Sequence, residues 1–260
     1  MQLRNILAGA LVVLATAAVT GLPLRSAAAE SPIVVELFTS QGCNSCPPAD
    51  AFLGELAKRP DVVALAMHVD YWDYIGWKDP FANRIYTERQ RGYSSALSQR
   101  FVYTPQMVVD GRFQDVGSDR AAITRLIDKA RSERAKLPSV TIARADEASE
   151  GPPTAVRVEG QGFRGTATIW LALYDFEHRT DVLRGENGGR RLADYNVVRE
   201  LRRVGTFDGQ PVTVSVDLGP LSKQHDACTV FVQAENTGPI LAAMVFKTIK
   251  GQQAALAPAH

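Results

Sequence analysis

The sequence predicts an α/β domain in its N-terminal half, followed by a mostly antiparallel β domain. Three observations lead to this fold class. Apolar β-branched runs alternate with helically periodic segments up to about residue 136. A turn that contains two cysteines joins the first strand to the first helix. Beyond residue 138, only short alternating segments follow, separated by Gly and Pro. A chain of 260 residues can hold one or two such domains, each with its own core.

The N-terminal half is expected to follow the order β-α-β-α-β-β-α. Residues 33–39 form a β-branched, mostly apolar run that is typical of a buried parallel strand. Pro47 and Pro48 fit the first turn of a helix, where a missing N–H costs little, and Pro60 ends that helix. The elements expected after it are a strand at 62–69, a helix at 81–99, a strand at 106–109, an Asp-Gly hairpin turn, a strand at 112–116 and a helix from 118 to about 130.

From residue 137 the pattern changes to short segments in which apolar and polar residues alternate. Their spacing predicts an antiparallel, sandwich-like domain. The segments are 140–143, 155–158, 166–174, 196–204, 212–216, 229–234 and 240–248. We therefore expect the α/β domain to cover residues 30–137, the β-rich domain 138–250, and a flexible tail 251–260.

Residues 1–29 are expected to form a signal peptide. Arg4 gives a positive start, an apolar run covers residues 6–22, and Ala27 and Ala29 form an A-x-A cleavage site. A membrane anchor is the alternative, but Gly and Pro interrupt the run, and no later run reaches the ~18 apolar residues that span a bilayer. We expect a periplasmic or secreted protein without stable membrane insertion.

The charge balance and the cysteine content limit which classes of function the chain can have. The 29 basic and 28 acidic side chains nearly balance, so no net field would attract nucleic acid. Export favours disulfides, yet there are only three cysteines, and Cys43 and Cys46 enclose a loop too short to constrain the unfolded chain. The pair therefore suggests that the two cysteines take part in a reaction and do not serve mainly to stabilise the fold. Cys228 lies in a strand-like segment and is expected to be a buried, unpaired core thiol.

The spacing of the cysteine pair predicts thiol–disulfide chemistry. Amide groups at a helix N-terminus lower a thiol pKa, so we expect Cys43, just before the helix, to be the nucleophile. Gly42 is expected to leave its sulfur open to solvent, with Cys46 inside the helix as the resolving thiol. A zinc site would need two more ligands, and haem attachment would need histidine where Pro47 stands. An inert disulfide remains the main alternative.

Three sequence motifs carry a resemblance to a known family. They are VELFTSQGCNSCPPAD at 35–50, HVDYWDY at 68–74 and YTPQMVVDG at 103–111. In these motifs the chain resembles the exported bacterial DUF1223 proteins, a family of unknown function. With the order of elements, residues 33–136 also resemble a thioredoxin fold. The resemblance thus implies a thioredoxin-like N-terminal domain followed by the β-rich domain.

The same resemblance implies further site residues. A thioredoxin fold places a cis-proline beside the cysteine pair; here it is Pro105, and the backbone of Thr104 would pair with an incoming peptide. A trans-proline at a strand start is the alternative. Tyr71 and Trp72 are expected at the rim of the substrate site, or else packed under the following helix or against the second domain. Glu36 corresponds to an acidic residue that would accept a proton from Cys46, although a structural partner of backbone or arginine remains open.

Taken together, these features predict an exported thiol–disulfide oxidoreductase that needs no cofactor. Its partner would be a protein or a small molecule with a thiol or a disulfide. The alternative is a non-catalytic periplasmic binding protein, or a copper-handling one, in which the cysteines form a structural disulfide. The reduction potential of the pair distinguishes them, because structural disulfides lie below about −300 mV.

Overall fold

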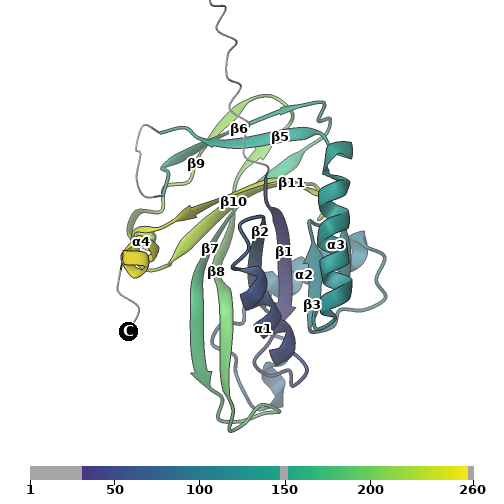
Figure 1. The fold of residues 1–260 in the computed structure, drawn as a ribbon, viewed down its shortest axis with the longest axis vertical. Helices are drawn as coiled ribbons and strands as arrows, with labels where there is room; N and C mark the ends of the chain where they lie inside the picture. The colour runs from purple at the N-terminus through teal and green to yellow at the C-terminus, as the bar shows by residue number, and fades with distance from the viewer. Residues whose placement is uncertain (1–30, 147–151, 257–260) are drawn as a thin grey trace, which may run out of the picture.

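A computed structural model describes residues 31–146 and 152–256, and the side chains up to residue 252 (Figure 1). The predicted signal peptide, residues 1–29, lies outside the described residues. The tail that we predicted from residue 251 begins inside a helix, α4, and residues 257–260 again lie outside the described part.

A mixed sheet of eight strands forms the centre of the protein, in the spatial order β11-β10-β7-β8-β2-β1-β3-β4. Its strands are β1 (Ile33–Thr39), β2 (Val62–His68), β3 (Gln106–Val109), β4 (Phe113–Val116), β7 (Ala167–Asp181), β8 (Arg191–Phe207), β10 (Ala227–Ala234) and β11 (Ile240–Lys247). Within this sheet β2 runs parallel to both of its neighbours, β1 and β8, and the other pairs are antiparallel. A second sheet of three strands has the order β5-β6-β9 and consists of β5 (Ser139–Arg144), β6 (Ala155–Gln161) and β9 (Val212–Ser215).

Helices cover both faces of the N-terminal part of the large sheet. They are α1 (Pro47–Leu56), α2 (Arg84–Ala96) and α3 (Arg120–Ser132). The short 3₁₀ turns are η1 (Asp73–Ile75), η2 (Arg134–Lys136) and η3 (Gly219–Lys223). A further helix, α4 (Ile249–Leu256), lies instead against β11 and η3. Along β1, Val35 and Leu37 pack with α1 and α3, whereas Val34 and Phe38 pack with α2. This alternation follows from the strand period of two and decides which face each polar residue of β1 occupies.

The predicted fold class, a thioredoxin-like domain followed by a separate β domain, is wrong. Strand β8 pairs with β2 at Ala66 and Val197, so β7, β8, β10 and β11 continue the sheet of the N-terminal part. Only β5, β6 and β9 form the second layer of the expected sandwich, over an apolar core that they share with β7, β10 and β11. The physical reason lies in β2, which is buried along its whole length and therefore needs cover beyond β1.

The hairpin of β7 and β8 is longer than the sequence predicted, with strands of 15 and 17 residues. It runs beside α1 and extends to the end of the sheet where β1 terminates (Figure 1). Gly54 of α1 allows this close approach, because a Cβ atom there would lie 2.6 Å from the ring of Tyr195 on β8. A part of the chain that is distant in sequence thus reaches the turn between β1 and α1.

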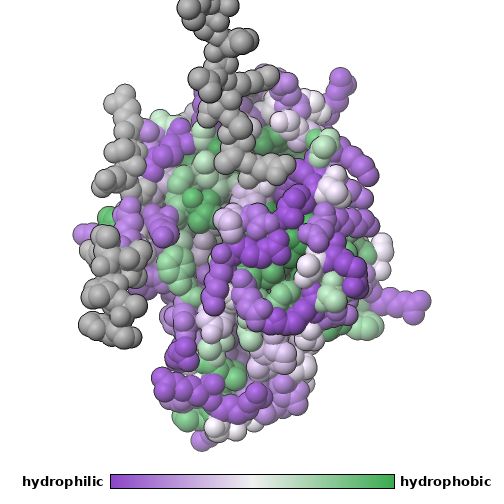
Figure 2. Space-filling model, viewed as in Figure 1, coloured by the Kyte–Doolittle hydropathy of each residue, from purple (hydrophilic) through white to green (hydrophobic). Residues whose placement is uncertain are grey.

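Polar side chains cover most of the face seen in Figure 2, with apolar side chains visible near β10 and β11. There a hollow of about 440 Å³ lies between β5 and β11, lined among others by Val140, Ile142 and Val245. Among the helices of the described residues, none is both long and apolar enough to cross a membrane.

Candidate functional site

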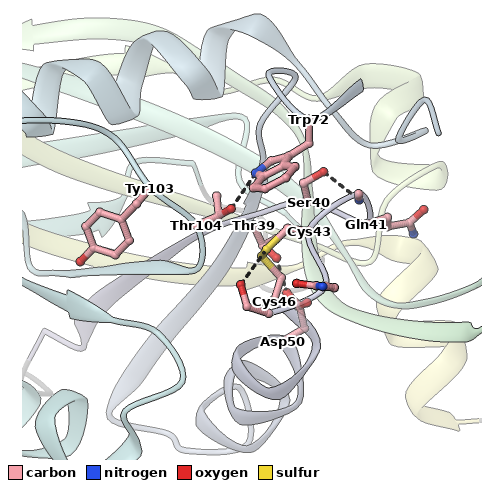
Figure 3. The surroundings of a disulfide bond; sticks show 12 residues. Thr39, Ser40, Gln41, Cys43, Cys46, Asp50, Trp72, Tyr103 and Thr104 are labelled. Atoms are coloured by element: carbon pink, nitrogen blue, oxygen red, sulfur yellow. Dashed lines mark hydrogen bonds between the residues drawn. A yellow bond between two sulfur atoms is a disulfide. The ribbon is translucent and has the colours of Figure 1, made fainter. Parts of the chain in front are cut away.

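A disulfide joins Cys43 and Cys46 at the point where the chain passes from β1 into α1 (Figure 3). The two Cα atoms lie 5.4 Å apart. Cys46 is the N-cap residue of α1, and its carbonyl accepts hydrogen bonds from the N–H groups of Ala49 and Asp50. Pro47 follows at the first helical position, as the sequence predicted. The sulfur atoms therefore lie at the positive end of the helix dipole.

The prediction that the Cys43 sulfur is open to solvent is wrong. Cys43 is 1% exposed and Cys46 is fully buried, while the two residues between them are exposed. The reason is the aromatic loop after β2: a Cβ atom on Gly42 would lie 3.0 Å from Cβ of Trp72 and 3.3 Å from Cδ1 of Ile75. The missing side chain at Gly42 allows this loop to pack tightly against the turn, and does not give access to the sulfur.

The segment that precedes β3 also reaches the disulfide. The peptide bond between Thr104 and Pro105 is cis, as the resemblance implied. The indole Nε1–H of Trp72 donates a hydrogen bond of 2.7 Å to Oγ1 of Thr104, and both side chains lie in the surroundings of the disulfide (Figure 3). Two of the predicted substrate residues, Trp72 and Thr104, therefore lie near the cysteine pair, and the cis-proline follows Thr104 in the chain.

Tyr71, the fourth predicted substrate residue, is hydrogen-bonded to α2. Its hydroxyl donates to Oε1 of Gln90 in α2, and burial raises the pKa of Tyr71 to about 12. Tyr71 therefore packs against the helix that follows its loop, which was the alternative to a place at the rim of the substrate site. Of the aromatic residues in this loop, Tyr74 is 81% exposed, while Nε1 of Trp77 donates to Oε1 of Gln41.

Glu36 lies on the wrong face of the sheet for a proton exchange with Cys46. Its side chain points toward α2, where Arg89 donates to both carboxylate oxygens over 2.5 and 3.1 Å. Tyr93 and Gln233 complete this buried cluster around the guanidinium group. Since α1 packs on the opposite face, Glu36 is a structural ion-pair partner, and its predicted catalytic role is wrong.

The buried acid beside the disulfide is Asp50, which our sequence analysis missed. It lies one helical turn after Cys46, is 5% exposed, and accepts a 2.8 Å hydrogen bond from Oγ1 of Thr39 (Figure 3). Burial, reinforced by the negative charge of Asp194, raises the pKa of Asp50 to about 8. The spacing of four residues from Cys46 was the available signal, because it puts both side chains on one face of a helix.

A network of buried charges continues from Asp50 under the cysteine loop. Nδ1 of His68 lies 2.8 Å from Oδ2 of Asp79, which also accepts from the backbone N–H of Gln41. The amide of Gln41 donates to Asp194 on β8, whose other oxygen lies 3.9 Å from Nε2 of His68. Burial alone would lower the pKa of His68, but Asp79 and Asp194 raise it to about 9. The imidazolium in turn holds the pKa of Asp79 below its ordinary value despite its burial.

Raising the pH from 6.5 to 9 is expected to lower the free energy of unfolding. In this window the folded chain keeps the His68 proton that the unfolded chain, with a pKa of 6.5, has lost. The stabilisation is complete below pH 6.5 and is lost as the pH rises through about 9, on the order of 3 kcal/mol. Asp50 also makes the stability fall as the pH rises to about 8, because the folded chain keeps its carboxyl proton after the unfolded chain has lost it. Urea unfolding at several pH values measures the effect.

The variant His68→Gln is the control for this pH dependence, because it keeps a polar side chain but removes the titrating group. Its stability should fall less steeply over the same window. A wild-type stability that is constant or increases between pH 6.5 and 9 would contradict a charged His68.

The tip of the β7–β8 hairpin closes the site from the outside. Nδ2 of Asn187 donates to the backbone carbonyls of Gln41 and Cys43, and Asn187 is fully buried. The sequence offered no signal for this contact, since the residues of the tip carry no recognisable motif. Within the described residues, no group of three or more His, Cys, Asp or Glu side chains is arranged to hold a metal ion. Cys228 is a buried free thiol as predicted, and burial raises its pKa to about 12.

Comparison with known proteins relates most of the chain to one family and to two solved structures. The family model described as "Protein of unknown function (DUF1223)" matches residues 34–233. An X-ray crystal structure of a protein from Agrobacterium tumefaciens is similar, with 32% identity, a TM-score of 0.69, and coverage of 89% of this chain and 99% of that chain. HBP35 of Porphyromonas gingivalis, at 14% identity and a TM-score of 0.55, covers 88% of this chain and 79% of its own and is alike in fold alone. No curated protein matches the sequence. The likeness to the A. tumefaciens structure spans both halves of the chain, which agrees with one continuous sheet.

Proposed function

The chain belongs to the DUF1223 family, and we propose that it is an exported thiol–disulfide oxidoreductase. The observation that carries this proposal is a C-x-x-C disulfide at the N-terminus of α1 with the buried carboxyl group of Asp50 one turn behind it. The composition of residues 1–29 supports export, where a disulfide of this kind persists. The partner would be a protein or a small molecule that carries a thiol or a disulfide.

The proposed reaction transfers two electrons. In the reduced protein, the Cys43 thiolate attacks one sulfur of a substrate disulfide, and the other substrate sulfur leaves as a thiolate. Cys46 then loses its proton and attacks Sγ of Cys43, which forms the internal disulfide and releases the second substrate thiolate. The protein is oxidised and the substrate reduced; the reverse sequence oxidises a dithiol substrate.

Asp50 is suited to manage the proton of Cys46 in both directions. A thiolate at Cys46 is costly because the residue is fully buried. Since burial raises the pKa of Asp50 to about 8, its carboxyl group is protonated at neutral pH and can supply the proton when the disulfide opens. When the disulfide forms, the same carboxylate can take the proton up.

The experiment that tests the proposal is the capture of a mixed disulfide by the variant Cys46→Ser. Without the resolving thiol, an intermediate on Cys43 cannot be released, so adducts sensitive to dithiothreitol should accumulate in extracts of exported proteins. The variant Cys43→Ser is the matched control and should give none. An absence of adducts in both variants would overturn the proposal. Adducts of equal yield in both would show that either thiol reacts, and would overturn the assignment of Cys43 as the nucleophile.

The low exposure of Cys43 favours a second candidate, a binding protein in which the disulfide is structural. A redox titration of the Cys43–Cys46 pair separates the two. A reduction potential below about −300 mV would indicate a structural bond, whereas a higher value is typical of catalytic pairs.

A further inference from the structure

The tip of the β7–β8 hairpin, residues 182–190, is a compact turn held by its own hydrogen bonds. Val182 donates to the carbonyl of Arg190, and Gly189 donates back to the carbonyl of Val182. Gly188 and Arg190 donate to the carbonyls of Gly185 and Asn187. The tip therefore has a defined shape, and it can hold another segment in place.

Asn187 uses all of its amide group to connect the tip with the cysteine loop. Its two N–H bonds point to the carbonyl oxygens of Gln41, at 2.9 Å, and Cys43, at 3.0 Å. Its own oxygen accepts a 2.7 Å hydrogen bond from Nη1 of Arg190. A side chain with both donors and its acceptor occupied has one favourable orientation, so Asn187 fixes the backbone on which Sγ of Cys43 is mounted.

Two neighbours of Asn187 extend this contact. Oε2 of Glu186 accepts from the backbone N–H of Asn44 at 3.3 Å. Gly185 lies against the aromatic loop, where an added Cβ would be 3.3 Å from Cβ of Trp77. The hairpin tip thus contacts both segments that cover the disulfide, the cysteine loop and the loop after β2.

We propose that this hairpin tip is a latch over the disulfide and that Asn187 is its positioning residue. An attacking thiolate must reach Sγ of Cys43, which is 1% exposed, and the two sulfurs must then move apart. Both changes require the loop from Gln41 to Asn44 to shift, and Asn187 opposes that shift through two carbonyls on the loop. Access to Cys43 is therefore governed by a segment that is distant in sequence. The role of the latch in catalysis rests on the proposed function.

The test is the rate at which dithiothreitol reduces the Cys43–Cys46 disulfide in the purified full chain. One thiolate of the reagent attacks Cys43 and expels Cys46; its second thiolate closes a ring and releases Cys43, so the reagent is oxidised as the protein gains two thiols. The variant Asn187→Ala should react about tenfold faster, because two ordinary hydrogen bonds no longer hold the loop. Asn187→Asp should react at least as fast, since a carboxylate repels both carbonyl oxygens.

Three comparisons make the test specific to the latch. Arg184→Ala, at an exposed position of the same tip, should stay within about twofold of the wild type. Glu186→Ala, also exposed, should give a rise of about twofold to threefold, and it does not threaten folding. Labelling of the buried thiol of Cys228 in the same samples reports general loosening and should not change.

Wild-type rates in the Asn187 and Glu186 variants would overturn the latch, and so would a parallel increase in Cys228 labelling. The experiment uses a small reagent and needs no biological partner. If mixed disulfides fail to form in extracts but the Asn187 variants accelerate reduction, the latch stands and the oxidoreductase proposal fails. If adducts form in extracts but the Asn187 and Glu186 variants are reduced at the wild-type rate, the oxidoreductase proposal stands and the latch fails.

Discussion

Replacing Asp79 by alanine is expected to lower the free energy of unfolding by about 3–5 kcal/mol. Asp79 is 2% exposed and accepts hydrogen bonds from His68 and from the backbone N–H groups of Gln41 and Phe81. Its removal leaves three donors, two of them buried, without this acceptor and deprives the imidazolium of its nearest carboxylate, since Asp194 lies 3.9 Å away. Urea unfolding followed by circular dichroism measures the loss as a lower midpoint at an unchanged slope.

The matched control is an exposed ion pair on the other side of the sheet. Glu88→Ala removes the i,i+4 partner of Arg84 on α2, and it should cost less than about 1 kcal/mol because solvent screens this pair. A loss of the same small size in Asp79→Ala would contradict a buried ion pair between a charged His68 and Asp79.

Elements whose cause is local could be predicted from the sequence. The strand expected at 33–39 is β1 with the same limits, because a β-branched apolar run needs no distant partner to be recognised. The first helix begins at Pro47, since proline at the first helical position marks a start that the sequence displays directly. Asp50 carries a similar local signal, its spacing from Cys46, although we assigned the buried acid to Glu36 by resemblance.

The pairing of β8 with β2 had no local signal. Ala66 and Val197 belong to segments whose own patterns say only that each is buried, and not which strand is its neighbour. The outer half of the hairpin was missed for a related reason. Residues 176–181 alternate between half-buried and exposed positions and are mostly polar, so they read as a loop, although they pair with β8 along their length.

These two omissions also explain the error about Cys43. The exposure of a side chain depends on everything that packs against it, and here the cover comes from Trp72 and from the hairpin that carries Asn187 and Asp194. Sequence spacing placed the sulfur correctly at a helix N-terminus. It could not show that a strand pair from the C-terminal half would extend over the same end of the sheet. Chemistry that resides in one segment is visible in a sequence, whereas access to it is a property of the whole fold.

The variant Asp50→Asn is expected to slow reduction of the disulfide by about 10²-fold at neutral pH. Attack on Cys43 expels Cys46 into a fully buried position, where a thiolate without a proton donor is strongly disfavoured. Asparagine keeps the shape of the side chain and an oxygen that can accept from Thr39, but it has no acidic proton. Rates with dithiothreitol, followed by mass-labelling of the released thiols, measure the loss.

The pH dependence distinguishes proton donation from a packing defect. The carboxyl group of Asp50 is protonated below its pKa of about 8, so the ratio of the wild-type rate to the Asp50→Asn rate should be largest below pH 8 and should shrink above it. Taking this ratio at each pH cancels the ionisation of the reagent. Glu55→Gln, an exposed acid on the same helix, should leave the rate and its pH profile unchanged. A ratio that stays constant from pH 6 to 9 would mean that Asp50 supports the loop without supplying a proton, and the buried carboxyl would then belong with His68 and Asp79 as part of the scaffold.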